Sequence, residues 1–137
     1  MSAKTFLDTL FVIALINRRD QYHGRATELA ARYERQAFLT TDAVLLEIGN
    51  ALARPFKRQA VEAIGHLLSS EDVQVVRLTA ELFAEAFALY ESHQDKEWGL
   101  TDCISFVVMR RENVQEALTF DQHFVQAGFQ ALMRDVG

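Results

Sequence analysis

Short runs of apolar residues alternate along the chain with longer segments in which apolar residues recur every three or four positions. Uninterrupted short runs are typical of buried strands in parallel sheets, and β-branched residues strengthen that interpretation at residues 73–76. The pattern predicts four strands and one further strand at the edge of the sheet, over residues 4–7, 37–40, 73–76, 117–120 and 129–133.

The segments between these runs are predicted to be helical, because their apolar residues share one helical face. Thr40, Thr41 and Asp42 are suitable caps for the third of these helices. The predicted helices cover residues 8–17, a segment around 26–33, residues 43–52, a segment that begins near Pro55, a segment around 82–90, residues 103–109, and a short segment from Asp121 to near Gly128.

Two of these helices are assigned apolar faces from their sequence. Proline suits the first turn of a helix, so Pro55 is placed in the first turn of the fourth helix. In the fourth helix the spacing of apolar residues predicts that Ala60, Ile64, Leu67 and Leu68 point inward. The fifth helix is predicted to be amphipathic, with one face formed by Leu82, Phe83, Ala86, Phe87 and Tyr90.

Residues 103–109 suit a strand or a helix, because three of them are β-branched. We favour a helix, since Thr101 and Asp102 can cap its beginning and Arg110 and Arg111 suit its carboxyl end. Strands then alternate with helices along the chain. This order predicts an α/β fold, in which helices cover both faces of a parallel sheet, folded as a single domain over residues 1–137.

The composition limits where such a domain can act. Half of the 137 residues are apolar and about a quarter are charged, as in folded domains. No apolar stretch approaches the ~20 residues that a membrane span requires, so no membrane partner is expected. The first residues lack the pattern of a secretion signal. The single cysteine, Cys103, allows no internal disulfide and fits a reducing compartment, and its place in an apolar run favours a buried apolar side chain. We therefore expect a cytoplasmic protein.

Four acidic residues occupy positions where the predicted elements should be apolar or where they meet. Asp8 and Asp121 follow the first and fourth strands, Glu47 interrupts the apolar stripe of the third helix, and Asp102 opens the apolar run that follows it. An unpaired buried charge is strongly unfavourable, so each carboxylate needs compensation. Mg²⁺ and Mn²⁺ provide it, because they prefer oxygen ligands and often bind substrate phosphates as well. The pattern indicates a metal-dependent enzyme that acts on phosphoesters.

Each acid also has a simpler interpretation. Asp8, Asp102 and Asp121 could cap helices, and Glu47 could form an ion pair with an arginine. Capping does not account for Glu47, and one ion pair does not account for the other three. In parallel sheets, ligands gather beyond the carboxyl ends of the strands. We therefore expect the four acids to meet at that edge of the sheet in one metal site.

Basic residues and histidines bear on the substrate. The net charge of −5 is unusual for a nucleic-acid-binding protein, but two divalent cations would reduce it to −1. Eleven of the 14 basic residues are arginines, which bind phosphate in a bidentate manner. His123, two residues beyond Asp121, is a candidate to line the site. Candidates for contacts with a phosphate backbone, if they are not simply solvated pairs, are Arg18–Arg19, Lys57–Arg58 and Arg110–Arg111.

The acidic positions lie in segments whose order and spacing resemble those of PIN-domain ribonucleases and, among these, VapC-like toxins. The segments are FLDT at residues 6–9, LEIGNAL at 46–52, LTDCISF at 100–106 and LTFDQHF at 118–124, followed by AGF at 127–129. The resemblance extends over almost the whole chain. Leu10 and Gln122 depart from the usual pattern, and both bear on substrate choice more than on the ligand set.

The resemblance implies a three-layer α/β/α sandwich around a mainly parallel sheet of four or five strands. It implies that Mg²⁺ or Mn²⁺ is held by the four residues that match the acids of the family, Asp8, Glu47, Asp102 and Asp121. It also implies that Thr9 and Thr101 steady the first and third acids, and Asp95 is a candidate for an additional acid beside them.

The function implied by the resemblance is that of an endoribonuclease that leaves a 5′-phosphate and serves as the toxin of a toxin–antitoxin pair. Its partners would be RNA, a small antitoxin whose peptide crosses the cleft, and a second copy of the chain in a homodimer. A housekeeping RNA-processing nuclease would share the same site. A non-catalytic α/β binding module would instead use the acids as caps and ion pairs, and a phosphatase of the haloacid-dehalogenase type would need an aspartate where Leu10 stands.

Overall fold

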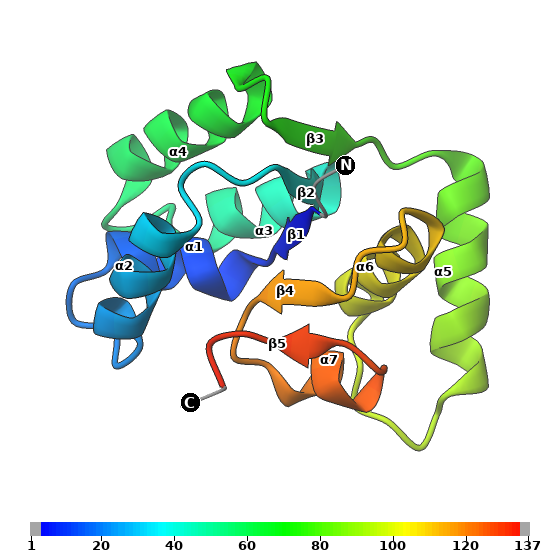
Figure 1. Ribbon diagram of the computed structural model, residues 1–137. Helices are drawn as coiled ribbons and strands as arrows, with labels where there is room; N and C mark the ends of the chain where they lie inside the picture. Colours follow the sequence, from blue (N-terminus) through cyan, green and yellow to red (C-terminus); the bar gives the residue numbers. More distant parts are fainter. Residues whose placement is uncertain (1–3, 135–137) are drawn as a thin grey trace.

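A computed structural model describes residues 4–134 and shows a five-stranded sheet at the centre of the chain (Figure 1). The strands lie in the order β3-β2-β1-β4-β5, and every neighbouring pair is parallel. The prediction of a mainly parallel sheet of four or five strands is confirmed. The strands are β1 (Thr5–Leu7), β2 (Phe38–Thr41), β3 (Val73–Val76), β4 (Glu116–Leu118) and β5 (Gln130–Ala131).

Within residues 4–134, seven helices connect the strands: α1 (Thr9–Ile16), α2 (His23–Arg32), α3 (Asp42–Ala51), α4 (Lys57–Ser69), α5 (Ala80–Ser92), α6 (Leu100–Arg111) and α7 (Gln122–Gln126). The first four connect β1, β2 and β3 on one side of the sheet, and α5 and α6 return the chain to β4 on the other side (Figure 1). Right-handed crossovers between parallel strands produce this division. The α/β/α layering agrees with the prediction. No helix in this part of the chain has the length and apolar content needed to cross a membrane.

The centre of the sheet brings together the two strand ends that carry predicted site residues. In the register of β1 and β4, Leu7 lies opposite Leu118. Asp8 follows one strand and Thr119 the other, at the same edge of the sheet. The chain leaves β1 toward β2 on one side and enters β4 on the other, so this edge is a switch point in the topology, where α/β sheets bind ligands.

The beginning of α4 differs from its prediction. Phe56 has a non-helical backbone and occupies the N-cap, so the helix begins at Lys57. Pro55 therefore precedes the helix, and its placement in the first turn was wrong. Of the four residues predicted to point inward, Ala60 and Leu67 are buried, Ile64 is half-buried and Leu68 is exposed, because only a narrow stripe of the helix faces the core.

The apolar face of α5 is also only partly covered. Leu82 and Ala86 are buried, whereas Phe83, Phe87 and Tyr90 are 43%, 46% and 43% exposed, so the predicted apolar face exists but the core covers only part of it. The cause is the position of α5 at the outside of the molecule, where it packs mainly on α6 (Figure 1). The three exposed rings stack along the helix, with successive centroids 6.5 and 6.3 Å apart.

The helical interpretation of residues 103–109 is confirmed, but its predicted cap is wrong. The helix α6 begins at Leu100, and Gly99 is the N-cap. Asp102 lies in the first turn, and its carboxylate accepts a hydrogen bond from the backbone N–H of Gly99 at 3.0 Å. Cys103 is fully buried in this helix, and burial raises the pKa of its thiol to about 11, as suits a structural apolar side chain.

Candidate active site

The four acidic residues of the predicted ligand set line one pocket of about 390 Å³ at the carboxyl edge of the sheet. Asp8 follows β1, Glu47 belongs to α3, Asp102 to the first turn of α6, and Asp121 is the N-cap of α7. Among the described residues, no lysine or arginine lines this pocket. The remaining lining residues are Thr9, Leu10, Asn50, Ala51, Glu97, Gly99 and His123.

Asp8 is the most deeply buried of the four acids, with 5% of its surface exposed. It occupies the N-cap position of α1, yet its side chain makes no capping hydrogen bond. Its Oδ2 atom instead accepts a hydrogen bond from the Thr119 hydroxyl at 2.8 Å. Burial, opposed by that bond and reinforced by the carboxylates of Asp102 and Glu47, raises the pKa of Asp8 to about 7. The pocket therefore concentrates negative charge that a cation would stabilise.

Glu47 is half-buried on the side of α3 that faces the pocket. Its Oε1 atom accepts a hydrogen bond from the Thr9 hydroxyl at 2.7 Å. Within the described part of the chain, no arginine or lysine forms an ion pair with it, so the simpler interpretation of Glu47 has no support. The expectation that Thr9 steadies the first acid needs correction, since its hydroxyl binds the second acid and only its backbone N–H acts on Asp8.

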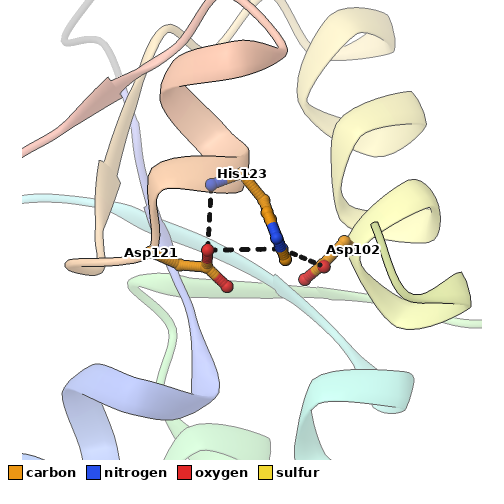
Figure 2. A group of neighbouring side chains, drawn as sticks. All are labelled: Asp102, Asp121 and His123. Carbon is orange, nitrogen blue, oxygen red and sulfur yellow. Dashed lines mark hydrogen bonds and ion pairs between the residues drawn. The ribbon is translucent and has the colours of Figure 1, made fainter. Parts of the chain in front are cut away.

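His123 lies between the carboxylates of Asp102 and Asp121 (Figure 2). Its Nδ1 atom is 3.1 Å from Oδ2 of Asp102 and 3.3 Å from Oδ1 of Asp121. One potential ligand atom from each of the three residues lies within 4.8 Å of the others, a spacing that suits a metal ion. Asp121 also caps α7 by accepting a hydrogen bond from the His123 backbone N–H at 2.9 Å. It is therefore both a helix cap and a residue of the pocket.

Asp102 has an environment different from that of Asp8. Burial and the nearby carboxylate of Asp121 raise its pKa, while hydrogen bonds from the Gly99 backbone and from His123 lower it. Thr101 was expected to steady this acid, but among the described residues its hydroxyl makes no hydrogen bond to it. The backbone N–H of Gly99 takes that place, because Asp102 lies in the first turn and its side chain reaches back to the N-cap.

Thr119 is a site residue that the sequence interpretation missed. It is completely buried at the end of β4. Its hydroxyl donates to Asp8 and accepts a hydrogen bond from the backbone N–H of Asp121 at 3.1 Å. One hydroxyl therefore fixes the positions of two acids. The available signal was a polar residue at the end of a buried strand, two positions before an aspartate.

Glu97 and Asn50 also line the pocket without having been predicted to do so. The sequence interpretation had instead proposed Asp95 as an additional acid. Asp95 does not line the pocket, and its carboxylate pairs with Lys96 at 2.9 Å on the surface. The loop before α6 thus contributes an acid to the pocket two residues later than expected.

The donor atoms of the pocket fit a hard divalent cation. Mg²⁺ and Mn²⁺ prefer oxygen ligands, and the pocket is lined by the carboxylates of the four predicted acids and of Glu97. Burial is the main cause that raises the pKa of Asp8, and the nearby carboxylates of Asp102 and Glu47 raise it further. A bound cation would remove the repulsion between these carboxylates.

Comparisons with known proteins agree with this geometry. The sequence matches the PIN domain over residues 5–130. The 23S rRNA-specific endonuclease VapC20, present in two strains of Mycobacterium tuberculosis, is 36% identical over 124 residues, which cover 90% of this chain and 94% of the relative. The crystal structure of Mycobacterium tuberculosis VapC20, described as a Sarcin-Ricin loop cleaving toxin, matches with a TM-score of 0.83 at 34% identity, covering 92% of this chain and 96% of that one.

Proposed function

We propose, since this chain belongs to the PIN-domain family, that it is an endoribonuclease that acts as the toxin of a toxin–antitoxin pair. The observation that carries the proposal is the convergence of Asp8, Glu47, Asp102 and Asp121 on one pocket. A binding module that uses its acids as caps and ion pairs has little support, because among the described residues Asp8 makes no capping hydrogen bond and Glu47 forms no ion pair. The relative VapC20 is named for 23S rRNA, and we propose the same substrate for this chain, together with action in the cytoplasm.

The acids would hold Mg²⁺ or Mn²⁺, with Asp8 and Asp102 as direct ligands and Asp121 and Glu47 completing the site or orienting bound waters. When bound, such an ion makes a coordinated water more acidic and stabilises charge on the phosphate oxygens. The threonines hold the first two acids in place, Thr119 through Asp8 and Thr9 through Glu47. Because the oxygens are oriented in advance, little reorganisation is needed when RNA arrives.

Induced expression in a bacterial host tests the toxin proposal. The expected result is growth arrest, together with a new 23S rRNA fragment that carries a 5′-phosphate. The Asp102→Asn variant should cause neither effect, because it removes one ligand charge while preserving the hydrogen-bond acceptor for Gly99. Cleavage of RNA without growth arrest would favour the housekeeping nuclease, and an intact rRNA pool in arrested cells would contradict the proposal.

A small antitoxin is the proposed protein partner. An arginine from its peptide, placed among the carboxylates, would neutralise them and block access for RNA, since arginine pairs well with carboxylates. Support comes from the acidic lining of the pocket, to which no lysine or arginine among the described residues contributes. Purification of the tagged chain from its native host should recover a small basic-tailed protein, and relief of growth arrest on co-expression would identify it.

Self-association into a homodimer is proposed as well. The stacked rings of Phe83, Phe87 and Tyr90 form an exposed apolar face on α5, and such faces mark protein interfaces. Light scattering after size exclusion should give the mass of a dimer for the parent chain and of a monomer for Phe87→Glu. Val61→Glu, at an exposed apolar position on α4, is the matched control and should remain dimeric.

A further inference from the structure

We propose that a basic patch outside the pocket binds phosphates of the RNA strand that leads to the site of cleavage. The patch is defined by Arg18, Arg19, Arg54, Lys57 and Arg58. The inference rests on the proposed function, because it states where the RNA substrate of that function lies.

Two separate segments bring these residues together. Arg18 and Arg19 follow the end of α1, and together with Phe56 and Gln59 they line a hollow of about 350 Å³. Lys57 is the first residue of α4. Figure 1 shows the end of α1 beside the beginning of α4. The patch is therefore a single surface, although the sequence presents it as distant pairs.

The charges of the patch are not neutralised by the protein. All five side chains are exposed, and among residues 4–134 none of them forms an ion pair with an acid. The first turn of α4 holds no acidic residue, and Phe56 provides no side-chain cap. Lys57 and Arg58 thus add positive charge at the positive end of a helix dipole. This repulsion is unfavourable in the free protein, and a bound anion would relieve it.

The pair Arg110–Arg111 differs from the patch, because both side chains interact with other parts of the protein. Arg111 donates to Glu85 at 2.6 Å and approaches Glu81 at 3.8 Å. Arg110 donates to the carbonyl of Ala127 at 3.3 Å, and its guanidinium lies 5.9 Å from the centre of the Phe129 ring. Of the three basic pairs found in the sequence, this one has structural partners, and the other two form the patch.

The patch is close enough to the pocket to share one strand of RNA. Leu10 lines the pocket and Ile16 lines the hollow, and both belong to α1. Six residues of helix correspond to roughly 9 Å. Ala51 lines the pocket and Phe56, five residues later, lines the hollow. The hollow and the pocket are therefore neighbours along α1 and along the segment that follows α3. This continuity with the pocket favours RNA over an acidic protein segment as the ligand.

Binding measurements on an inactive background test the proposal. The probe is a fluorescein-labelled 12-nucleotide single-stranded RNA, measured by anisotropy between 50 and 200 mM KCl with Asp8→Asn in every protein to prevent cleavage. The test variants are R18Q/R19Q and K57Q/R58Q. The control R32Q/R35Q removes the same charge from exposed arginines, at the end of α2 and before β2, away from the carboxyl edge of the sheet.

Each test variant should bind the probe about tenfold more weakly, and its plot of log affinity against log salt should be less steep by about 1.4, the value for two lost phosphate contacts. The control should bind as the background protein does. Equal affinities and slopes in test and control variants would overturn the proposal, as would loss of antitoxin binding with RNA binding intact. If the background protein bound no RNA and the parent cleaved none, the proposed function itself would fail.

Discussion

The two halves of the pocket hold their carboxylates by different means. In the half built from β1 and α3, Asp8 and Glu47 accept hydrogen bonds from the hydroxyls of Thr119 and Thr9. In the half built from α6 and α7, Asp102 and Asp121 lie on either side of Nδ1 of His123 (Figure 2).

These two arrangements predict which half of the pocket depends more on a bound cation. A hydroxyl orients a carboxylate without neutralising it, whereas an imidazole can carry positive charge. Asp8, in the first half, has its pKa raised to about 7, chiefly by burial. Asp102, in the second half, receives bonds from Gly99 and His123 that counteract burial. We therefore expect changes in the first half to have the larger consequences.

The largest expected effect is that of Asp8→Asn on catalysis. The amide preserves the shape of the side chain and can still accept from Thr119, but it removes the charge that would bind a cation. Cleavage of RNA should fall about a thousandfold, since electrostatic groups at reacting centres have effects of that size. Asp95→Asn, at an exposed acid outside the pocket, is the matched control and should cleave at the parental rate.

The stability of the metal-free protein should depend on pH through the same residue. The pKa of Asp8 is 3.8 as an ordinary carboxyl and about 7 in the fold. Between these values the folded state keeps a proton that the unfolded state has lost, so the free energy of unfolding falls as pH rises from about 4 to about 7. The loss is on the order of 4 kcal/mol. Urea unfolding in EDTA at several pH values measures it, and an unchanged pH dependence in Asp8→Asn would contradict this assignment.

Thr119→Val tests how the first half is positioned. Valine preserves the shape but leaves Asp8 without its donor and the Asp121 N–H without its acceptor. Cleavage should fall about a hundredfold, as for loss of a residue that orients a ligand. The pH profile of cleavage should also shift to higher pH. In the parent protein the hydrogen bond from Thr119 lowers the pKa of Asp8, so its loss raises that pKa. Thr119→Ser should restore both the rate of cleavage and its pH profile. If serine restored neither, Thr119 would have a packing role alone.

His123→Gln should have the smallest effect, in the second half. The backbone N–H of residue 123 still reaches Asp121, so the cap of α7 is retained. The imidazole between the two aspartates is lost, and a nitrogen ligand is tolerated less well by Mg²⁺, which demands near-ideal octahedral coordination by oxygen, than by Mn²⁺. Calorimetric titration should show about tenfold weaker Mn²⁺ binding with Mg²⁺ binding less affected. Equal losses for the two ions would assign His123 a positioning role only.

The elements of the fold were largely predictable, because short apolar runs and helical periodicity reflect burial in a covered parallel sheet. Their boundaries were less so. Strands predicted over residues 37–40 and 117–120 are found at Phe38–Thr41 and Glu116–Leu118, since hydrogen-bond partners on neighbouring strands decide where a strand ends. Periodicity also identified the apolar residues of α5 without revealing that Phe83, Phe87 and Tyr90 are only partly covered within the described chain.

The candidate site was predictable where its chemistry conflicts with its surroundings. Acids in apolar runs stand out, and all four of them line the pocket. The hydroxyl contacts could not be predicted in the same way. Thr119 reaches Asp8 because Leu7 pairs with Leu118, a register that depends on tertiary packing. The direction of the loop before α6 likewise decides that Glu97, and not Asp95, faces the pocket.

Direct measurement of Mn²⁺ binding by electron paramagnetic resonance at pH 7.5 tests the central claim that remote acids form one cation site. The parent chain should bind Mn²⁺, Asp8→Asn and Asp102→Asn should each bind at least about tenfold more weakly, and Asp95→Asn should bind as the parent does. Parental affinity in both pocket variants, or no binding by the parent chain, would contradict it.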